Sequence, residues 1–379
     1  MLTEVEGRLA VTGEVLTLTE HINLPDLGIP SEQITWSRVS LTSDKWICVR
    51  HDDYDGSFQR KQTNKKQHLA TLLTLCHKTP PQTWGVKADS VLVNPSLPLI
   101  ALKAGRKLEV FNIQSRSLTK SCHMDEEIGY WTWVNDDVIA MVTEKYIYHW
   151  LVHSEQDCPR RMFERDRRLE DSEVVSYRVD PGMKWFALTG LYPEDRRICG
   201  VTQLYSVDHC VTQCIAAHAV YFAQYKFEWN RHPSTVLCVA SRDALYGKAH
   251  VVELGPHNPG NKALTNHTDG LKFPDDTEKF DFPVQIQVST DYRLFYVITK
   301  YGQIFICDLE TSAALYSTPI CTDIVITSVL NTSTQGVLGI TKLGQVLSID
   351  IKKNALIEYV REQLKKPNIA NRLEKTLCR

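Results

Sequence analysis

The stretch VITKYGQIFICDLET (297–311) returns in outline further along the chain as GITKLGQVLSID (339–350). In both segments an apolar run reaches Thr-Lys, turns at a Gly-Gln pair and enters a second apolar run that ends at an aspartate. Val, Ile, Phe and Leu favour strands, and Gly302 and Gly344 supply the permissive backbone that a tight turn needs. The two segments are therefore predicted to be β-hairpins of one recurring unit.

Similar pairs of apolar runs, each pair joined by a turn, occur throughout the chain. The lags between successive units range from 40 residues (Ile100 to Ala140) to 58 residues (Cys238 to Tyr296), which fits four-stranded propeller blades better than helical repeats. The seven units are anchored, in chain order, at Ile47, Ile100, Ala140, Ala187, Cys238, Tyr296 and Leu338.

One small twisted sheet cannot bury both of its faces, so it has to pack against similar sheets, and a radial arrangement leaves only short edges exposed. We therefore predict an all-β fold, a seven-bladed β-propeller over residues 14–351, preceded by an extension over 1–13. The strand pattern ends after Asp350. A helical linker is predicted over 352–379, as the start of an α-solenoid.

Two segments differ from the repeat. Residues 51–83 contain the basic stretch KQTNKKQ and are predicted to form a long loop inserted in the first unit. Residues 354–366 place Leu356, Tyr359, Val360 and Leu364 on one helical face after a capping Asn354, and Pro367 is expected to end that helix before a second one opens.

Composition excludes several classes of protein. The 379 residues carry a formal net charge of −2, which gives no basic field for nucleic acid or an acidic membrane surface. The eleven cysteines are odd in number and scattered, so we expect reduced thiols, and CxxxC at Cys210 and Cys214 has no second pair for a metal. The amino terminus lacks a signal-peptide pattern, and a cytosolic protein is expected.

Sequence signatures of catalysis are absent: the chain has no GxSxG, no phosphate-binding loop and no HExxH. His149 is interpreted as a packing residue, and the acidic runs 125–127 and 274–276 as solvated loops. No catalytic residues, metal or cofactor are predicted. A propeller enzyme, a hydrolase or isomerase with a site at the central channel, remains an alternative.

Several long segments resemble the amino-terminal domain of the clathrin heavy chain family. They are NPSLPLIALKAGRKLEVFNI (94–113), YIYHW (146–150), KWFALTG (184–190), QLYSVD (203–208), FAQYKFE (222–228), DFPVQIQVS (281–289) and the stretch at 297–311. The resemblance covers the chain from about Leu16 onward. It implies a seven-bladed propeller joined to a helical linker, and a coat protein of endocytic and trafficking vesicles.

In that family, grooves between blades bind short extended adaptor peptides, chiefly the leucine-rich acidic clathrin boxes. Here the resemblance places the groove between the first two blades at Trp84, Val86, Ile100, Lys107, Glu109, Phe111 and Arg116. The strand KLEVF independently puts residues 107, 109 and 111 on one face, with Leu108 and Val110 on the other. An apolar pocket at Phe111 with a cationic rim of Lys107 and Arg116 is expected.

This sequence differs from the family pattern in that groove. The family has arginine at Trp84, threonine at Lys107, glutamine at Glu109 and lysine at Leu118. We therefore expect a weaker preference for acidic peptides and a larger apolar contact.

Two further family sites are carried over by position. A top-face site for aromatic peptides would lie at Trp36, Glu173 and Val175, and a groove between blades four and five at Trp185, His209 and Gln213. His209 replaces an arginine of the family, which weakens anion attraction.

The implied partners are adaptor proteins with leucine-acidic or aromatic short motifs, and clathrin light chain and other heavy chains through the leg of the molecule. Nucleic acid is not an expected partner, and the membrane is reached only through adaptors, on the cytoplasmic face of coated pits and vesicles. A propeller scaffold in another trafficking or ubiquitin-linked complex remains open as an alternative.

Overall fold

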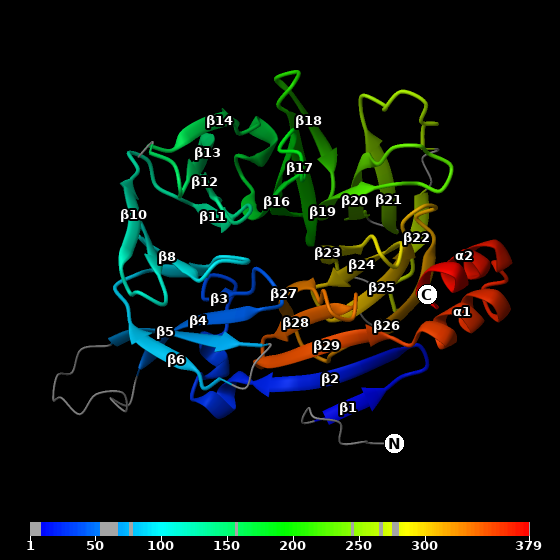
Figure 1. The fold of residues 1–379 in the computed structure, drawn as a ribbon, viewed down its shortest axis with the longest axis horizontal. Helices are drawn as coiled ribbons and strands as arrows, with labels where there is room; N and C mark the ends of the chain where they lie inside the picture. The colour runs from blue at the N-terminus through cyan, green and yellow to red at the C-terminus, as the bar shows by residue number, and fades with distance from the viewer. Residues whose placement is uncertain are drawn as a thin grey trace. The chain divides into compact units, whose positions relative to one another are not determined.

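The computed structural model describes residues 9–53, 67–75, 79–155, 158–243, 246–264, 268–274 and 280–378. Their strands, labelled in Figure 1, form seven sheets, six of four strands and one of five. The chain is a seven-bladed β-propeller. Contacts divide it into a smaller unit, Asn23–Arg165 with Lys342–Gln345, and a larger unit, Met1–Ile22, Asp166–Thr341 and Val346–Arg379.

The smaller unit holds three antiparallel sheets and two 3₁₀ turns, η1 (Leu24–Leu27) and η2 (Ser31–Gln33). The sheets are β3 (Val39–Ser40), β4 (Trp46–Asp53), β5 (Gln67–Thr74) and β6 (Gln82–Gly85); β7 (Ser90–Val93), β8 (Leu99–Ala104), β9 (Lys107–Asn112) and β10 (Leu118–His123); and β11 (Tyr130–Trp133), β12 (Val138–Val142), β13 (Tyr146–Leu151) and β14 (Arg160–Glu164).

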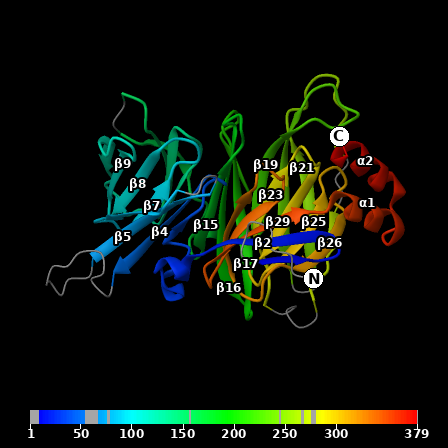
Figure 2. The same cartoon turned by 60° about the horizontal axis from the view of Figure 1, so that its bottom comes forward.

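The larger unit holds four sheets, the turn η3 (Arg167–Leu169) and two helices (Figure 2). Three sheets are β15 (Glu173–Val179), β16 (Trp185–Glu194), β17 (Arg197–Ser206) and β18 (Val211–Ala216); β19 (Ala219–Tyr225), β20 (Ser234–Arg242), β21 (Gly247–Leu254) and β22 (Thr268–Leu271); and β23 (Pro283–Ser289), β24 (Leu294–Thr299), β25 (Gln303–Asp308) and β26 (Ala314–Pro319). The fourth has the order β1 (Leu9–Thr12), β2 (Leu16–Asn23), β29 (Gln345–Ile351), β28 (Val337–Thr341), β27 (Val325–Leu330).

The predicted repeat is confirmed at the level of single strands. The seven anchor residues lie in β4, β8, β12, β16, β20, β24 and β28, which is the second strand of each repeating unit. The anchor strands are apolar because the second strand of a four-stranded blade is covered on both faces. All five residues of β12 and of β28 are buried.

The fourth sheet of the larger unit joins the beginning and the end of the propeller. Its first two strands come from residues 9–23, and its other three from residues 325–351 (Figure 1). Strand β1 therefore lies inside the extension predicted over 1–13, of which residues 1–8 are outside the described residues.

The two segments with the pattern Thr-Lys-x-Gly-Gln, 299–303 and 341–345, both form hairpin turns, as predicted. Gly302 has φ +79° and Gly344 has φ +92°, a region that side-chain-bearing residues rarely adopt. A Cβ on Gly344 would also lie 2.6 Å from Ile34 and from Pro25. Glycine is needed at this turn for backbone conformation and for close packing.

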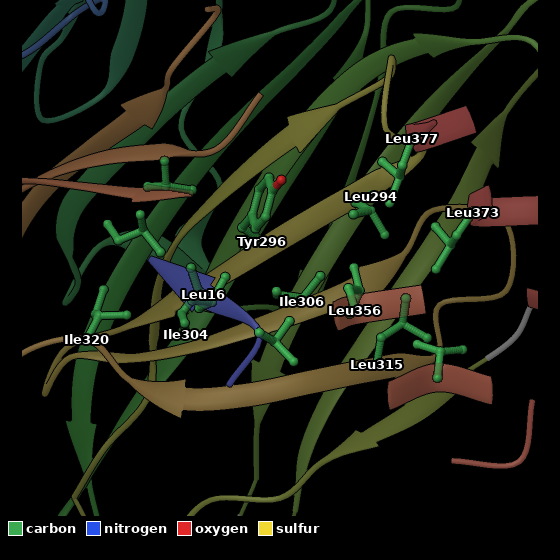
Figure 3. Close-up of a cluster of buried hydrophobic side chains, with 14 of the residues drawn as sticks. Leu16, Leu294, Tyr296, Ile304, Ile306, Leu315, Ile320, Leu356, Leu373 and Leu377 are labelled. Atoms are coloured by element: carbon green, nitrogen blue, oxygen red, sulfur yellow. The ribbon is translucent and has the colours of Figure 1, made fainter. Parts of the chain in front are cut away.

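The two helices, α1 (Lys353–Glu362) and α2 (Pro367–Leu377), pack on the larger unit through an apolar core. Figure 3 shows Leu356, Leu373 and Leu377 of the helices beside side chains of the neighbouring strands. The expected face is confirmed within α1, since Leu356 and Val360 are buried and Tyr359 packs against the same core. The helix was predicted to run to Pro367 but ends at Glu362, so Leu364 packs against this core from beyond α1. The predicted cap was wrong: Asn354 lies inside α1, whose N-cap is Lys352. Pro367 opens α2, where its missing N–H costs nothing.

Buried charges add to the attachment of α2. The Arg372 guanidinium contacts Asp308 Oδ1 at 2.6 Å and Glu310 Oε2 at 2.8 Å, and both carboxylates are almost fully buried. Glu310 Oε1 also accepts a hydrogen bond of 2.6 Å from Tyr225 Oη. These contacts provide donors for the buried carboxylates beneath the helix.

The loop predicted over 51–83 was wrong at both ends. His51–Asp53 complete β4, residues 67–74 form β5, and residues 82–85 form β6. Residues 54–66 and 76–78, including most of the basic stretch, lie outside the described residues. The strand Gln67–Thr74 was missed because the polar stretch before it dominated the local composition.

Candidate functional site

The residues predicted to line a groove between the first two blades all belong to the smaller unit. In the pairing of β8 with β9, Ile100 is opposite Phe111, Leu102 opposite Glu109, and Ala104 opposite Lys107. Directly opposite residues share one face of an antiparallel sheet, so these six side chains line the same face. Leu108 and Val110 belong to a different buried cluster, as expected.

Four of the predicted residues meet in one apolar cluster. Trp84, Val86 and Phe111 are half-buried and pack, with the buried Ile100, against a core shared by the sheets β3–β6 and β7–β10. Trp84 comes from β6, the outer strand of its sheet. The seam between these two sheets is therefore apolar at its outer side, where Trp84 and Phe111 keep part of their rings in solvent.

Leu118 enlarges this apolar surface. It is paired with Phe111 across β9 and β10 and is 51% exposed. The register shifts between Leu118 and Lys120, so Lys120 is paired with Val110 on the other face. There its ammonium donates hydrogen bonds to the carbonyl oxygens of Leu151 and Ser154, at 3.0 and 2.5 Å. The bulge at Thr119 thus gives the groove face a leucine and removes a lysine from it.

The charges of the groove differ from the expected cationic rim. Lys107 Nζ lies 2.6 Å from Glu109 Oε1, with side-chain exposures of 53% and 29%. Lys107 is therefore neutralised by its neighbour on the same face. Arg116 is exposed in the turn between β9 and β10 with φ +56°, and its backbone N–H donates to Asn112 O at 2.9 Å. Side chains two residues apart on a strand share one face, so the spacing of Lys107 and Glu109 could have predicted this ion pair.

The residues predicted for a top-face site belong to different units. Trp36 is 47% exposed in the smaller unit. Glu173 and Val175 lie in β15 of the larger unit, where Val175 is skipped in the pairing with β16. This site stays a prediction.

Two of the three residues predicted for the blade four to five groove share a sheet face. Trp185 is paired with Ser206 and Gln213 with Leu204, and Trp185 and Leu204 pack in one cluster with the sheet β19–β22. His209 is exposed in the turn between β17 and β18. Peptide binding at this groove also stays a prediction.

A cleft of about 380 Å³ in the larger unit was missed by the sequence analysis. It is lined by Tyr192 and Arg197 near the β16–β17 turn, by Arg242 at the end of β20 and by Phe282 just before β23, among other residues, with acidic and basic groups mixed. Arg242 lies over the Phe273 ring at 3.9 Å. The part-exposed face around Trp84 and Phe111 in the smaller unit has the simpler chemistry, an apolar surface with paired charges, and is the better candidate.

His149 has a strongly perturbed acid-base behaviour. Burial lowers the pKa of His149 to about 4, which fits the packing role expected for it. Among the described residues, no His, Cys, Asp and Glu side chains are grouped in threes so as to hold a metal ion. No helix in the described part of the chain is long and apolar enough to span a membrane.

Comparison with known proteins gives consistent results. The chain is 33% identical over 354 residues to "Clathrin heavy chain" of Drosophila melanogaster and 34% identical over 354 residues to "Clathrin heavy chain 2" of Homo sapiens, each match covering 93% of this chain. It is 34% identical over 358 residues, 94% of its length, to "Probable clathrin heavy chain" of Schizosaccharomyces pombe. It spans 20–21% of the length of these relatives.

No family model matches the chain. A solved chain from "Crystal Structure of Mitotic Checkpoint Complex" superposes with a TM-score of 0.55 over 85% of this chain and 93% of that one, at 10% identity. This likeness supports the fold alone.

Proposed function

Because this chain is a homologue of the N-terminal region of the clathrin heavy chain, we propose that it is a peptide-docking module of a vesicle coat. Short extended segments of adaptor proteins bind in the groove between the sheets β3–β6 and β7–β10 and link the coat to membrane cargo. The observation that carries the proposal is the apolar cluster of Trp84, Val86, Ile100 and Phe111, whose aromatic members are part-exposed at a seam between sheets. Such a seam accepts alternate side chains of an extended peptide.

A shallow groove of this kind favours weak binding. A single short peptide covers less surface than a standard protein interface, so dissociation constants on the order of 10 to 100 μM are expected. Many copies of the module in one lattice raise the effective concentration of adaptor motifs. Weak individual sites suit a coat that forms and dissolves, with the rest of the heavy chain and its light chain supplying the lattice on the cytoplasmic face of coated vesicles.

The test is a titration of fluorescent leucine-rich peptides against the wild-type chain and Phe111→Ala. A peptide can cover only the part of the Phe111 ring that is in solvent, so the variant would lose about 0.5 to 1 kcal/mol of apolar contact, which corresponds to roughly 2- to 5-fold weaker binding. Leu151→Ala is the control, because Leu151 is an apolar residue of the same unit that is 47% exposed at the end of β13, outside the proposed groove. Equal affinity of Phe111→Ala and Leu151→Ala would show that the peptides do not bind in this groove.

A further inference from the structure

The ion pair inside the groove bears on which peptides it accepts. Lys107 and Glu109 are two residues apart on β9, on the face that also carries Phe111, and their charged atoms are 2.6 Å apart. Salt bridges with this exposure contribute little to folding stability, about 0 to 1 kcal/mol. The pair also affects recognition, because the lysine is held by an internal carboxylate at the place where a ligand carboxylate would bind it.

An acidic peptide gains little from such a pair. To contact Lys107, a ligand carboxylate has to approach Glu109, and the attraction to one charge is offset by repulsion from the other. Arg116 lies in the β9–β10 turn, beyond the Phe111 end of the face. It can contact one end of a peptide, but it does not give the groove a continuous cationic rim.

The apolar part of the face is correspondingly large. Leu118 and Phe111 are directly opposite each other on β10 and β9, and Leu102 is opposite Glu109 on β8. Trp84 and Val86 pack against the same cluster from the neighbouring sheet. An uncharged peptide can cover these side chains without removing an unpaired charge from water.

We infer that this groove selects extended peptides rich in leucine or aromatic residues and poor in carboxylates, and that Glu109 determines this specificity by neutralising Lys107. The inference rests on the proposed function, since it names the ligand class of the same groove. Glu109 acts through Lys107 and is a specificity residue with no catalytic role.

Three peptides with one leucine-rich core test this inference, flanked by aspartates, by asparagines or by lysines. For the wild-type chain, the asparagine peptide is expected to bind at least as tightly as the aspartate peptide. In Glu109→Gln, Lys107 becomes available, and the aspartate peptide is expected to bind about 3- to 5-fold more tightly at low salt, with the gain lost at high salt. The asparagine peptide should change by less than about 2-fold.

The control variant is Asp243→Asn. It makes the same change in net charge, and it also removes the anion of an exposed ion pair, with Lys248 at 2.8 Å, in the larger unit. It should leave the ranking of the three peptides as in the wild type. A second variant, Leu118→Lys, places a cation opposite Phe111 and should favour the aspartate peptide by a similar factor.

The outcomes separate this inference from the proposed function. Tighter binding of the aspartate peptide by the wild-type chain, unchanged in Glu109→Gln, would overturn the inference and leave the proposed function standing. Failure of all three peptides to bind the folded wild-type chain would overturn both. Restored acid preference in Glu109→Gln and not in Asp243→Asn supports the inference.

Discussion

Arg372 of α2 offers the sharpest test of how the helices are attached to the propeller. We consider Arg372→Met, which keeps much of the apolar stem and removes the guanidinium that contacts Asp308 at 2.6 Å and Glu310 at 2.8 Å. The two carboxylates are 0% and 1% exposed, so the variant leaves buried charges with fewer partners. Removing one member of a buried ion pair typically costs about 3 to 5 kcal/mol.

Other contacts place the expected cost at the lower end of that range. Asp308 Oδ2 accepts hydrogen bonds from the backbone N–H and the hydroxyl of Thr311, at 2.8 and 2.6 Å. Glu310 keeps the Tyr225 hydroxyl and lies 3.5 Å from Arg293. We therefore expect about 3 kcal/mol of lost stability, expressed mainly as opening of α2.

The matched control is Arg361→Met. Arg361 joins α1 to Glu374 of α2 at 2.8 Å, but the two side chains are 36% and 56% exposed. An exposed pair contributes about 0.2 to 1 kcal/mol. The two variants thus remove the same chemical group from the same helical pair, once from a buried site and once from the surface.

Amide hydrogen exchange read by mass spectrometry measures the opening of α2 directly. A cost of about 3 kcal/mol corresponds to roughly 100-fold faster exchange of the α2 amides in Arg372→Met, against less than about 5-fold in Arg361→Met. The strand amides of β24 and β25 should keep their protection. Equal acceleration in the two variants would refute the claim that the buried network holds the helix.

Three further outcomes are expected. Because burial lowers the pKa of His149 to about 4, this side chain stays neutral in the native state, while in the unfolded chain it takes up a proton below pH 6.5. The free energy of unfolding that depends on His149 is therefore fully present above pH 6.5 and falls by up to about 3 kcal/mol as the pH drops to 4. In urea denaturation at a series of pH values, His149→Gln should reduce this fall in the free energy of unfolding, whereas the control His209→Gln, at an exposed residue, should not. Gly344→Ala should lower the melting temperature more than Gly105→Ala, since both have positive φ but only the Gly344 site is filled by neighbouring atoms. Trp84→Arg should tighten binding of leucine-acidic peptides and weaken binding of neutral ones, measured on a peptide array.

The architecture could be predicted from sequence because every blade has a second strand that is buried on both faces. Burial on both faces requires an apolar second strand, so Ala140 in β12 and Leu338 in β28 stand out from their surroundings. The strand Gln67–Thr74 could not be located in the same way. Residues 54–66 separate it from its partner β4 in the chain, and local composition carries no information about a pairing across that separation.

The sequence predicted which side chains of β9 share a face, but it did not predict how their charges are paired. Period-two alternation correctly placed Lys107, Glu109 and Phe111 together. Leu118 and Lys120 are two residues apart and would share one face of a regular strand, but a bulge in β10 shifts the register by one residue, so that Leu118 shares the face of Phe111 and Lys120 lies on the other. A register shift of this kind is set by tertiary packing and leaves no periodic signal.

The two copies of the hairpin phrase also show where repetition stops being informative. Each copy ends at an aspartate, but Asp350 accepts hydrogen bonds from Thr334 and Ser348 of its own sheet. Asp308 binds Arg372, 64 residues further along the chain. Both aspartates thus close a local turn, Asp308 through Thr311, but only Asp308 of the two also anchors a helix. The helices follow β29 in the chain, yet their buried ion pairs are made with residues at the end of β25, so their attachment is fixed by a neighbouring sheet in addition to the one from which they emerge.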